Sequence, residues 1–198
     1  MSAPAINPLV LFFASIFTSN ILLTNFLGTC SFISISKDLK SSNGLGMAVT
    51  LVITITTAIN WMLEKYLIQP LNLGYLRYIL YIIVIAAVVQ MLEMIIDRVS
   101  PNLYTVLGIF LPLITVNCAI FGVALFMQLR NYTFLQSVFF GLGSGLGWWL
   151  AIILLAGIRK KTDNAPVPAP LKGIGITLIT IGIMAMAFIG FAGMINVQ

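Results

Sequence analysis

The chain of 198 residues is 60% hydrophobic and only 8% charged, with a net charge of +5 and a mean hydropathy of +1.09. Because soluble domains carry about a quarter charged residues, this composition excludes a soluble globular domain, a disordered chain and a nucleic-acid-binding module. The chain has no histidine, which excludes Ser-His-Asp triads, histidine general bases and histidine-ligated metal sites. Its two cysteines are too few for a disulfide framework or a complete four-thiolate metal site.

Apolar stretches long enough to cross a lipid bilayer follow one another along the chain. A membrane-spanning helix needs about 20 predominantly apolar residues, and an open sheet is excluded at that depth because its backbone hydrogen bonds would be unmet. The first stretch has no Lys or Arg before it and no clear cleavage site, so we interpret it as a span and not as a signal peptide. The predicted spans are residues 9–35, 44–63, 76–96, 103–128, 134–157 and 172–195.

The first predicted span is longer than a straight crossing requires and has small polar residues around Cys30. Such side chains can satisfy the backbone groups that a helix break exposes inside the membrane. We therefore expect a broken helix here, with a kinked but ordinary packing helix as the alternative. The polar and small residues around the cysteine are Asn25, Gly28, Thr29 and Ser31.

The third predicted span carries an acidic residue, Glu93, close to its end. Gln90 and Asp97 lie three residues before and four residues after it, which places all three side chains on one helix face. A charge at the centre of a bilayer is costly, so an acid in a span needs a reason. Glu93 is interpreted either as an anchor at the membrane boundary or as a residue for cation entry or proton handling.

The fourth predicted span repeats the features of the first. Proline removes a helical hydrogen bond and clashes with the preceding turn, so a break is expected before Cys118. Interrupted spans at matching positions in two halves of a chain indicate a site near the middle of the membrane. The helix-breaking and polar residues before this cysteine are Gly108, Pro112, Thr115 and Asn117.

The fifth predicted span contains the glycine-rich stretch GLGSGLG at residues 141–147. It has no preceding strand and no Lys-Ser/Thr pair, which argues against a nucleotide loop. Glycines four residues apart instead predict a close approach between helices in lipid. Trp148 and Trp149, which follow, are expected to be packing or interface aromatics.

A spacing of 88 residues recurs between chemically matching positions and indicates an internal repeat. Three spans in each half is an odd number, so the second half would cross the membrane in the opposite sense to the first. The predicted fold is an all-α integral membrane protein with six transmembrane helices as two inverted three-helix repeats and broken first and fourth helices. The single membrane domain, 1–198, would comprise repeats 8–100 and 101–198. The pairs that share the spacing are Cys30 with Cys118, Asn43 with Asn131, and Trp61 with Trp149.

The positively charged residues predict an orientation. With six spans, the side on which the chain begins carries Lys65, Arg77 and Arg130. The excess of Lys and Arg marks the cytoplasmic side, so both termini are expected to face the periplasm. The opposite, cytoplasmic side carries Lys37, Lys40, Arg98, Arg159, Lys160, Lys161 and Lys172.

Cys30 and Cys118 are the candidate chemical site. They could be inert buried thiols, a disulfide between the halves, or thiolate ligands of a metal. A two-iron cluster normally takes four cysteines and this chain supplies two, so the metal hypothesis predicts a partner chain that supplies the other two. A single iron held by four thiolates would require the same.

Four segments carry a resemblance to a known family. NFLGTCSFISISK (25–37), LGIFLPLITVNCAIFG (107–122), GLGSGLGWWLAIILLAGIR (141–159) and VPAPLKGIGITLI (167–179) resemble the family of membrane subunits found in bacterial Na+-translocating NADH:quinone reductases and the related Rnf complexes. The likeness runs along essentially the whole chain. Asn60-Trp61 and GLGWWLAI favour the E-type subunits of the quinone reductase, whereas PLNLGYLR (70–77) is similar to the A-type subunits of Rnf.

The resemblance implies an electron-transfer subunit of a redox-driven Na+ pump in the bacterial inner membrane. It implies that Cys30 and Cys118 bind half of an intramembrane [2Fe–2S] cluster, or a single iron, and that the homologous D subunit binds the other half. It further implies a six-subunit complex that passes electrons from NADH to ubiquinone, with FAD, FMN and riboflavin in its other subunits and no complete active site in this chain. A secondary transporter with inverted repeats and a structural scaffold are the alternatives from other classes.

Overall fold

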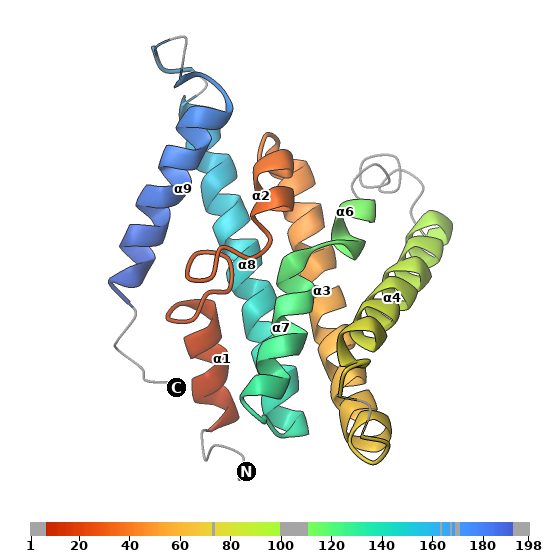
Figure 1. The fold of residues 1–198 in the computed structure, drawn as a ribbon. Coiled ribbons are helices and arrows are strands. Elements are labelled where there is room, and N and C mark those ends of the chain that lie inside the picture. The colour runs from red at the N-terminus through yellow and green to blue at the C-terminus, as the bar shows by residue number, and fades with distance from the viewer. Residues whose placement is uncertain are drawn as a thin grey trace.

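The computed structural model describes residues 7–72, 74–99, 111–162, 164–166, 168 and 171–191, and within these ranges it contains helices and no strand (Figure 1). The beginning of the predicted fourth span, including Gly108, and the end of the predicted sixth span lie outside these ranges. The helices are α1 (Pro8–Ile16), α2 (Thr29–Ile35), α3 (Leu39–Leu63), the π-helix η1 (Glu64–Ile68), α4 (Arg77–Val99), α6 (Leu111–Thr115), α7 (Cys118–Leu129), α8 (Phe134–Thr162) and α9 (Ile174–Ile189).

Three of the described helices are long and apolar enough to cross a membrane by themselves. They correspond to the predicted second, third and fifth spans. The segments predicted as the fourth and sixth spans contain the shorter apolar helices Leu113–Leu129 and Ile174–Ile189. The three long spans are Leu39–Ile68, Arg77–Ile95 and Phe134–Thr162.

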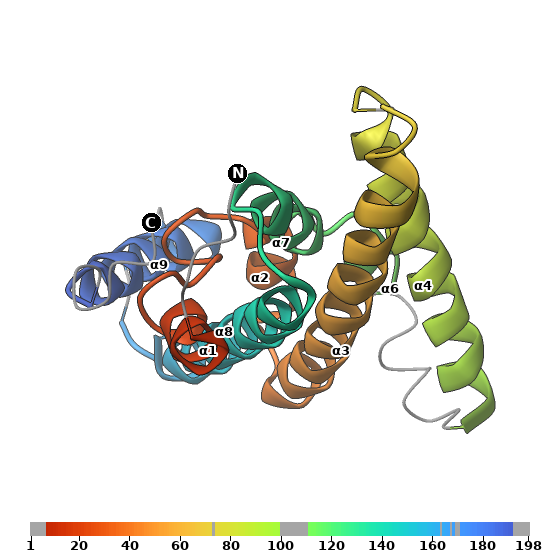
Figure 2. The same cartoon turned by 90° about the horizontal axis from the view of Figure 1, so that it is seen from below.

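Successive segments run in alternating directions along the molecule. In Figure 1, α3 runs from the upper end to the lower end, α4 returns upward, α8 runs upward and α9 runs downward. The short helices complete this course, since α2 lies above α1 and α7 continues downward from α6. Figure 2 shows α9 and α4 on opposite sides of the molecule, with α7 and α8 between them.

The helix α3 begins five residues earlier than the predicted span 44–63 and ends at the predicted residue, Leu63. Asp38 caps its first turn, where the Ser41 N–H donates to the Asp38 carboxylate over 3.2 Å. This backbone hydrogen bond stabilises the charged form and lowers the pKa of Asp38. At the other end, Glu64 does not stop the helix, because the chain continues as η1 to Ile68.

The glycine-rich segment of α8 brings three helices together, as predicted. Gly141 and Gly145 face α3, and a Cβ atom at Gly145 would lie only 2.7 Å from the Thr50 Cα atom. Gly143 and Gly147 face α1, where a Cβ at Gly147 would lie 3.0 Å from the Ile16 carbonyl oxygen. The contact between α3 and α8 is consequently the most extensive one between helices.

Candidate cysteine site at two helix breaks

The first predicted span is broken between α1 and α2, and Asn20 holds the break together. Its amide nitrogen donates to the carbonyl of Ile16 at 3.0 Å and to that of Gly147 at 2.9 Å. Its side-chain oxygen accepts the N–H of Leu22 at 3.1 Å and of Leu23 at 3.4 Å. Asn20 is fully buried, so it supplies the backbone partners that water cannot supply there.

The fourth predicted span is also broken, between α6 and α7, and Asn117 caps the second half-helix. Its side-chain oxygen accepts the N–H of Ala119 at 3.0 Å. Its amide nitrogen donates to the Ser31 hydroxyl at 3.2 Å, and Ser31 belongs to α2. One buried asparagine therefore stabilises its own break and ties it to the other one.

The backbone of Gly28 contacts the cysteine of the opposite break. Its N–H donates to the sulfur of Cys118 at 2.8 Å. Gly28 has a φ of +85°, a conformation that side-chain-bearing residues rarely adopt. A Cβ atom here would also lie 2.8 Å from the Trp148 Nε1 atom and 3.0 Å from the Asn117 side-chain oxygen. Both the backbone conformation and the available space therefore require glycine.

The two predicted site residues lie at the starts of the two inner half-helices. Cys30 is the second residue of α2 and Cys118 is the first residue of α7. Both are free thiols, Cys30 exposed and Cys118 half-buried. The contact between Gly28 and Cys118 brings the two breaks together. Non-helical residues beside Cys30 are also exposed, namely Thr24, Asn25 and Phe26.

This arrangement fits half of a thiolate metal site. Thiolates are soft ligands suited to iron–sulfur clusters and zinc. Within the described ranges, no group of three or more His, Cys, Asp or Glu residues could hold a metal ion. A complete site would therefore need ligands from outside this chain, and the exposed Cys30 leaves a direction from which they could come.

Reciprocal contacts join the two tryptophans to the opposite halves of the chain. The Trp61 Nε1–H donates to the Tyr132 carbonyl at 2.8 Å, and the Trp149 Nε1–H donates to the Asn43 side chain at 3.1 Å. Trp61 packs edge-on against Phe134 with ring centroids 5.2 Å apart, while Trp149 packs over Gly46. Gly46 and Phe134 are again 88 residues apart, so matching positions make matching contacts.

An ionic cluster at the end of α3 was missed by sequence reasoning, which used Glu64 and Arg77 only as boundary charges. Glu64 is 6% exposed and forms a two-point ion pair with Arg77, at 2.8 and 3.0 Å. The Tyr81 hydroxyl donates to the same carboxylate at 2.9 Å. The missed signal was an acid four residues after a buried asparagine, Asn60, on the same helix face.

Glu93 lies deeper in its helix than the sequence predicted. The helix α4 extends to Val99, six residues beyond Glu93, and the Glu93 side chain is half-buried. Asp97 and Gln90 are exposed. The boundary role and the cation role of Glu93 both stay predictions.

Comparison with known proteins shows the relatives of this chain. The family described as "Rnf-Nqr subunit, membrane protein" matches residues 9–195. The E-type subunit of the Na(+)-translocating NADH-quinone reductase of Proteus mirabilis (strain HI4320) is 49% identical over 189 residues, covering 92% of this chain and 96% of that protein. The protein of the same name from Chlamydia trachomatis serovar L2 is 50% identical over 200 residues, covering 95% of this chain and 82% of that protein.

Proposed function

Because this chain belongs to the Rnf-Nqr family of membrane subunits, we propose that it is the E-type subunit of a Na+-translocating NADH-quinone reductase. The identity of about half the residues over more than nine-tenths of the chain supports this assignment over the A-type subunit of an Rnf complex. The co-purifying subunits test it. A flavin-linked NADH-oxidising partner is expected, and a ferredoxin-linked set rich in clusters would indicate Rnf instead.

The proposed architecture is a six-span protein made of two inverted three-helix repeats, 8–100 and 101–198. The alternating course of the helices in Figure 1 supports it. The reciprocal contacts of Trp61 and Trp149 support it as well, since a two-fold relation between halves produces such exchanged pairs. The excess of Lys and Arg at the upper end in Figure 1 makes that end cytoplasmic and both termini periplasmic.

The proposed site is an intramembrane iron–sulfur centre, a [2Fe–2S] cluster or a single iron, with Cys30 and Cys118 as two of its ligands. The observation that carries this proposal is the direct contact of the two breaks through Gly28 and Cys118. Irregular backbone in the membrane must be covered by protein or line a water-filled cavity. The exposed irregular residues beside Cys30 therefore support a covering partner, which we assign to the homologous D subunit with two further cysteines.

The residues of this chain would hold and insulate the centre. When bound, an iron–sulfur centre takes up and releases single electrons. Gly28 holds the Cys118 sulfur in place through its N–H, and hydrogen bonds to the sulfurs are among the features that set the potential of an iron–sulfur centre. The link from Asn117 to Ser31 fixes the distance between the two half-helices. Leu22 and Leu23, in the first break, are buried apolar residues.

The test measures iron and acid-labile sulfide in the purified complex after Cys30→Ser or Cys118→Ser. Each replacement should remove about two iron atoms and the matching sulfide per complex, because a two-iron cluster needs all four thiolates. Thr29→Val, next to Cys30 on the same half-helix, is the matched control and should leave the iron content unchanged. Full iron retention in both cysteine variants, with the complex intact, would refute the site. Iron loss without sulfide loss would indicate a single iron.

A further inference from the structure

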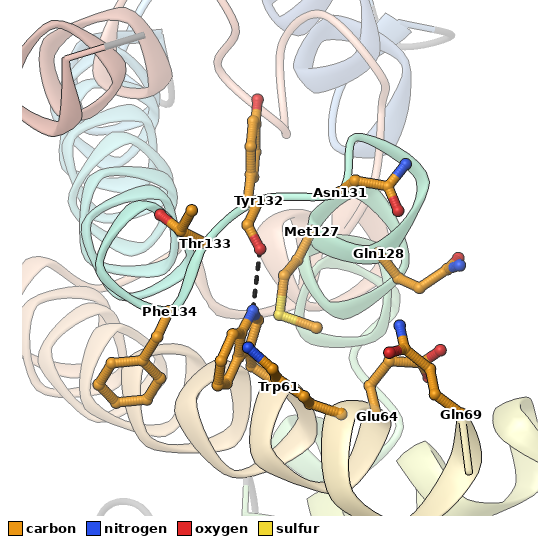
Figure 3. A pocket seen from close by; sticks show the side chains of 10 residues that line it. Trp61, Glu64, Gln69, Met127, Gln128, Asn131, Tyr132, Thr133 and Phe134 are labelled. Carbon is orange, nitrogen blue, oxygen red and sulfur yellow. Dashed lines mark hydrogen bonds between the residues drawn. The ribbon is translucent and has the colours of Figure 1, made fainter. Parts of the chain in front are cut away.

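A polar pocket lies at the lower end of the molecule, away from the cysteines. It has a volume of about 360 Å³ and lies between the end of α3, η1 and the connection from α7 to α8. Figure 3 shows Trp61 at its centre, with the Trp61 indole bound to the Tyr132 carbonyl and the ring of Phe134 beside it. Its other lining residues are Glu64, Lys65, Gln69, Met127, Gln128, Asn131 and Thr133.

The charges in this pocket leave one cation uncompensated. The carboxylate of Glu64 is neutralised by Arg77 and accepts from Tyr81. Lys65 is exposed, and its ammonium lies 4.9 Å from the centre of the Trp61 ring. Among the described acidic residues, Glu64 is the only one at this end. The others are Asp38, Glu93 and Asp97, on the upper ends of α3 and α4 (Figure 1).

In the proposed repeat, the position that matches Glu64 carries an apolar residue. The residue 88 positions after Glu64 is Ile152, which is fully buried in α8. A helix in the matching place therefore packs with an apolar residue and continues without a π-helical turn. Insertions of π-helix are rare and are found frequently at functional sites. The π-helix Glu64–Ile68 and the buried ion pair therefore mark this pocket as a candidate binding site.

We propose that this pocket binds the phosphate of an anionic phospholipid headgroup, a role separate from the proposed electron transfer. Lys65 supplies the positive charge, and the amides of Gln69, Gln128 and Asn131 can donate hydrogen bonds. A phosphate group can accept hydrogen bonds from an ammonium and from amide N–H groups at the same time. Arg130, adjacent to the pocket, adds to the positive potential, and its guanidinium donates to the Tyr132 hydroxyl at 3.1 Å.

The surroundings of the pocket favour a lipid over free phosphate. A membrane lipid needs a polar site for its headgroup and an apolar surface beside it for its acyl chains. The helix surfaces next to the pocket carry large exposed apolar side chains, which can lie along an acyl chain. These residues are Met62, Phe134 and Leu135.

The test uses the intact complex in phosphatidylcholine vesicles that contain a trace of photoactivatable phosphatidylglycerol. Illumination should label peptides that contain residues 61–69 and 127–134. Lys65→Gln should reduce this labelling about fivefold, the effect of one basic residue near a membrane surface, and Lys65→Arg should retain it. Lys160→Gln, which removes an exposed lysine at the opposite end, is the matched control and should leave the labelling unchanged.

Several outcomes would overturn the proposal. Equal labelling by photoactivatable phosphatidylcholine would remove the preference for an anionic headgroup. Loss of labelling on addition of inorganic phosphate would indicate a free-phosphate site. Absence of labelling at both peptides would mean that another protein of the complex fills the pocket. Because the iron content is measured independently, each of these results can be distinguished from a failure of the proposed iron centre.

Discussion

The two tryptophans that lie 88 residues apart make matching contacts in different surroundings. Trp61 lies beside a buried ion pair, a lysine and several amides. Trp149 lies between apolar hollows, whose walls include Ile16, Phe17 and Ile153 on one side and Met47 and Leu51 on the other. Hence the packing of α3 against α8 does not depend on which polar or charged groups surround each tryptophan. Both tryptophans make reciprocal contacts, whereas among the described residues the buried ion pair lies beside Trp61 and not beside Trp149.

Replacement of Arg77 by leucine tests whether the packing is independent of the ion pair, and it should change the free energy of unfolding more than the replacements of glycine and tryptophan that follow. The change leaves the Glu64 carboxylate buried without its cation, which should reduce the free energy of unfolding by about 3–5 kcal/mol. The 22% exposure of the Arg77 side chain favours the lower value. Equilibrium unfolding of the purified protein in detergent measures the change.

The double replacement Glu64→Ile with Arg77→Leu is the decisive comparison. It places at position 64 the same apolar residue, isoleucine, that the second half carries at Ile152. It should recover most of the lost stability, since apolar groups often replace buried ion pairs at little cost. If the double variant is as unstable as Arg77→Leu alone, the fold requires the ion pair, and the packing is not independent of it.

Replacement of Gly145 by leucine tests the packing that both halves share. The new side chain would meet the backbone of Thr50, so α3 and α8 would have to separate. The expected loss is about 1–3 kcal/mol, the usual cost of overpacking. Gly157→Leu on the same helix is the control, because a Cβ there would have no atom within 4 Å. Thermal unfolding of the two variants should differ clearly, and equal midpoints would contradict the close approach.

Phenylalanine replacements at Trp61 and Trp149 should have the smallest effects. Each removes one indole donor, and the loss at Trp61 should be about 0.5–1.5 kcal/mol because the hydrogen bond to Tyr132 is partly buried. The loss at Trp149 should be smaller, since its bond to Asn43 is exposed to competing polar groups. Unfolding titrations of both variants measure the two losses of unfolding free energy. A larger loss for the Trp149 variant would contradict the prediction.

The sequence predicted features that depend on residue type and spacing. Breaks near Cys30 and Cys118 were predicted from proline, glycine and small polar residues, and the structure contains both. The second break falls at Val116 and Asn117, whereas Pro112 itself lies within α6. Close packing of the glycine-rich segment is confirmed too. It could be predicted because a glycine has no side chain, so another helix can approach its backbone closely whichever helix that is. The inverted repeat stays a prediction that the exchanged tryptophan contacts support.

The features that sequence reasoning missed depend on partners that only the folded chain brings together. Asn20 was missed because its role requires the carbonyl of Gly147, 127 residues away. The end of α3 at Leu63 was predicted correctly, but its continuation as η1 to Ile68 was missed because a charged residue usually marks the edge of a span. Glu64 is instead neutralised by Arg77 across a turn, and no periodic pattern of apolar residues reveals such a pairing.

The contact between α3 and α8 also has a consequence for synthesis. The ribosome completes α3 long before it begins α8, and several seconds pass between the two events. During that interval the surface around Gly46 and Thr50 has no glycine-rich helix against it. Until α8 is inserted and packs against α3, this surface of the nascent first half must therefore be covered by lipid or by the insertion machinery.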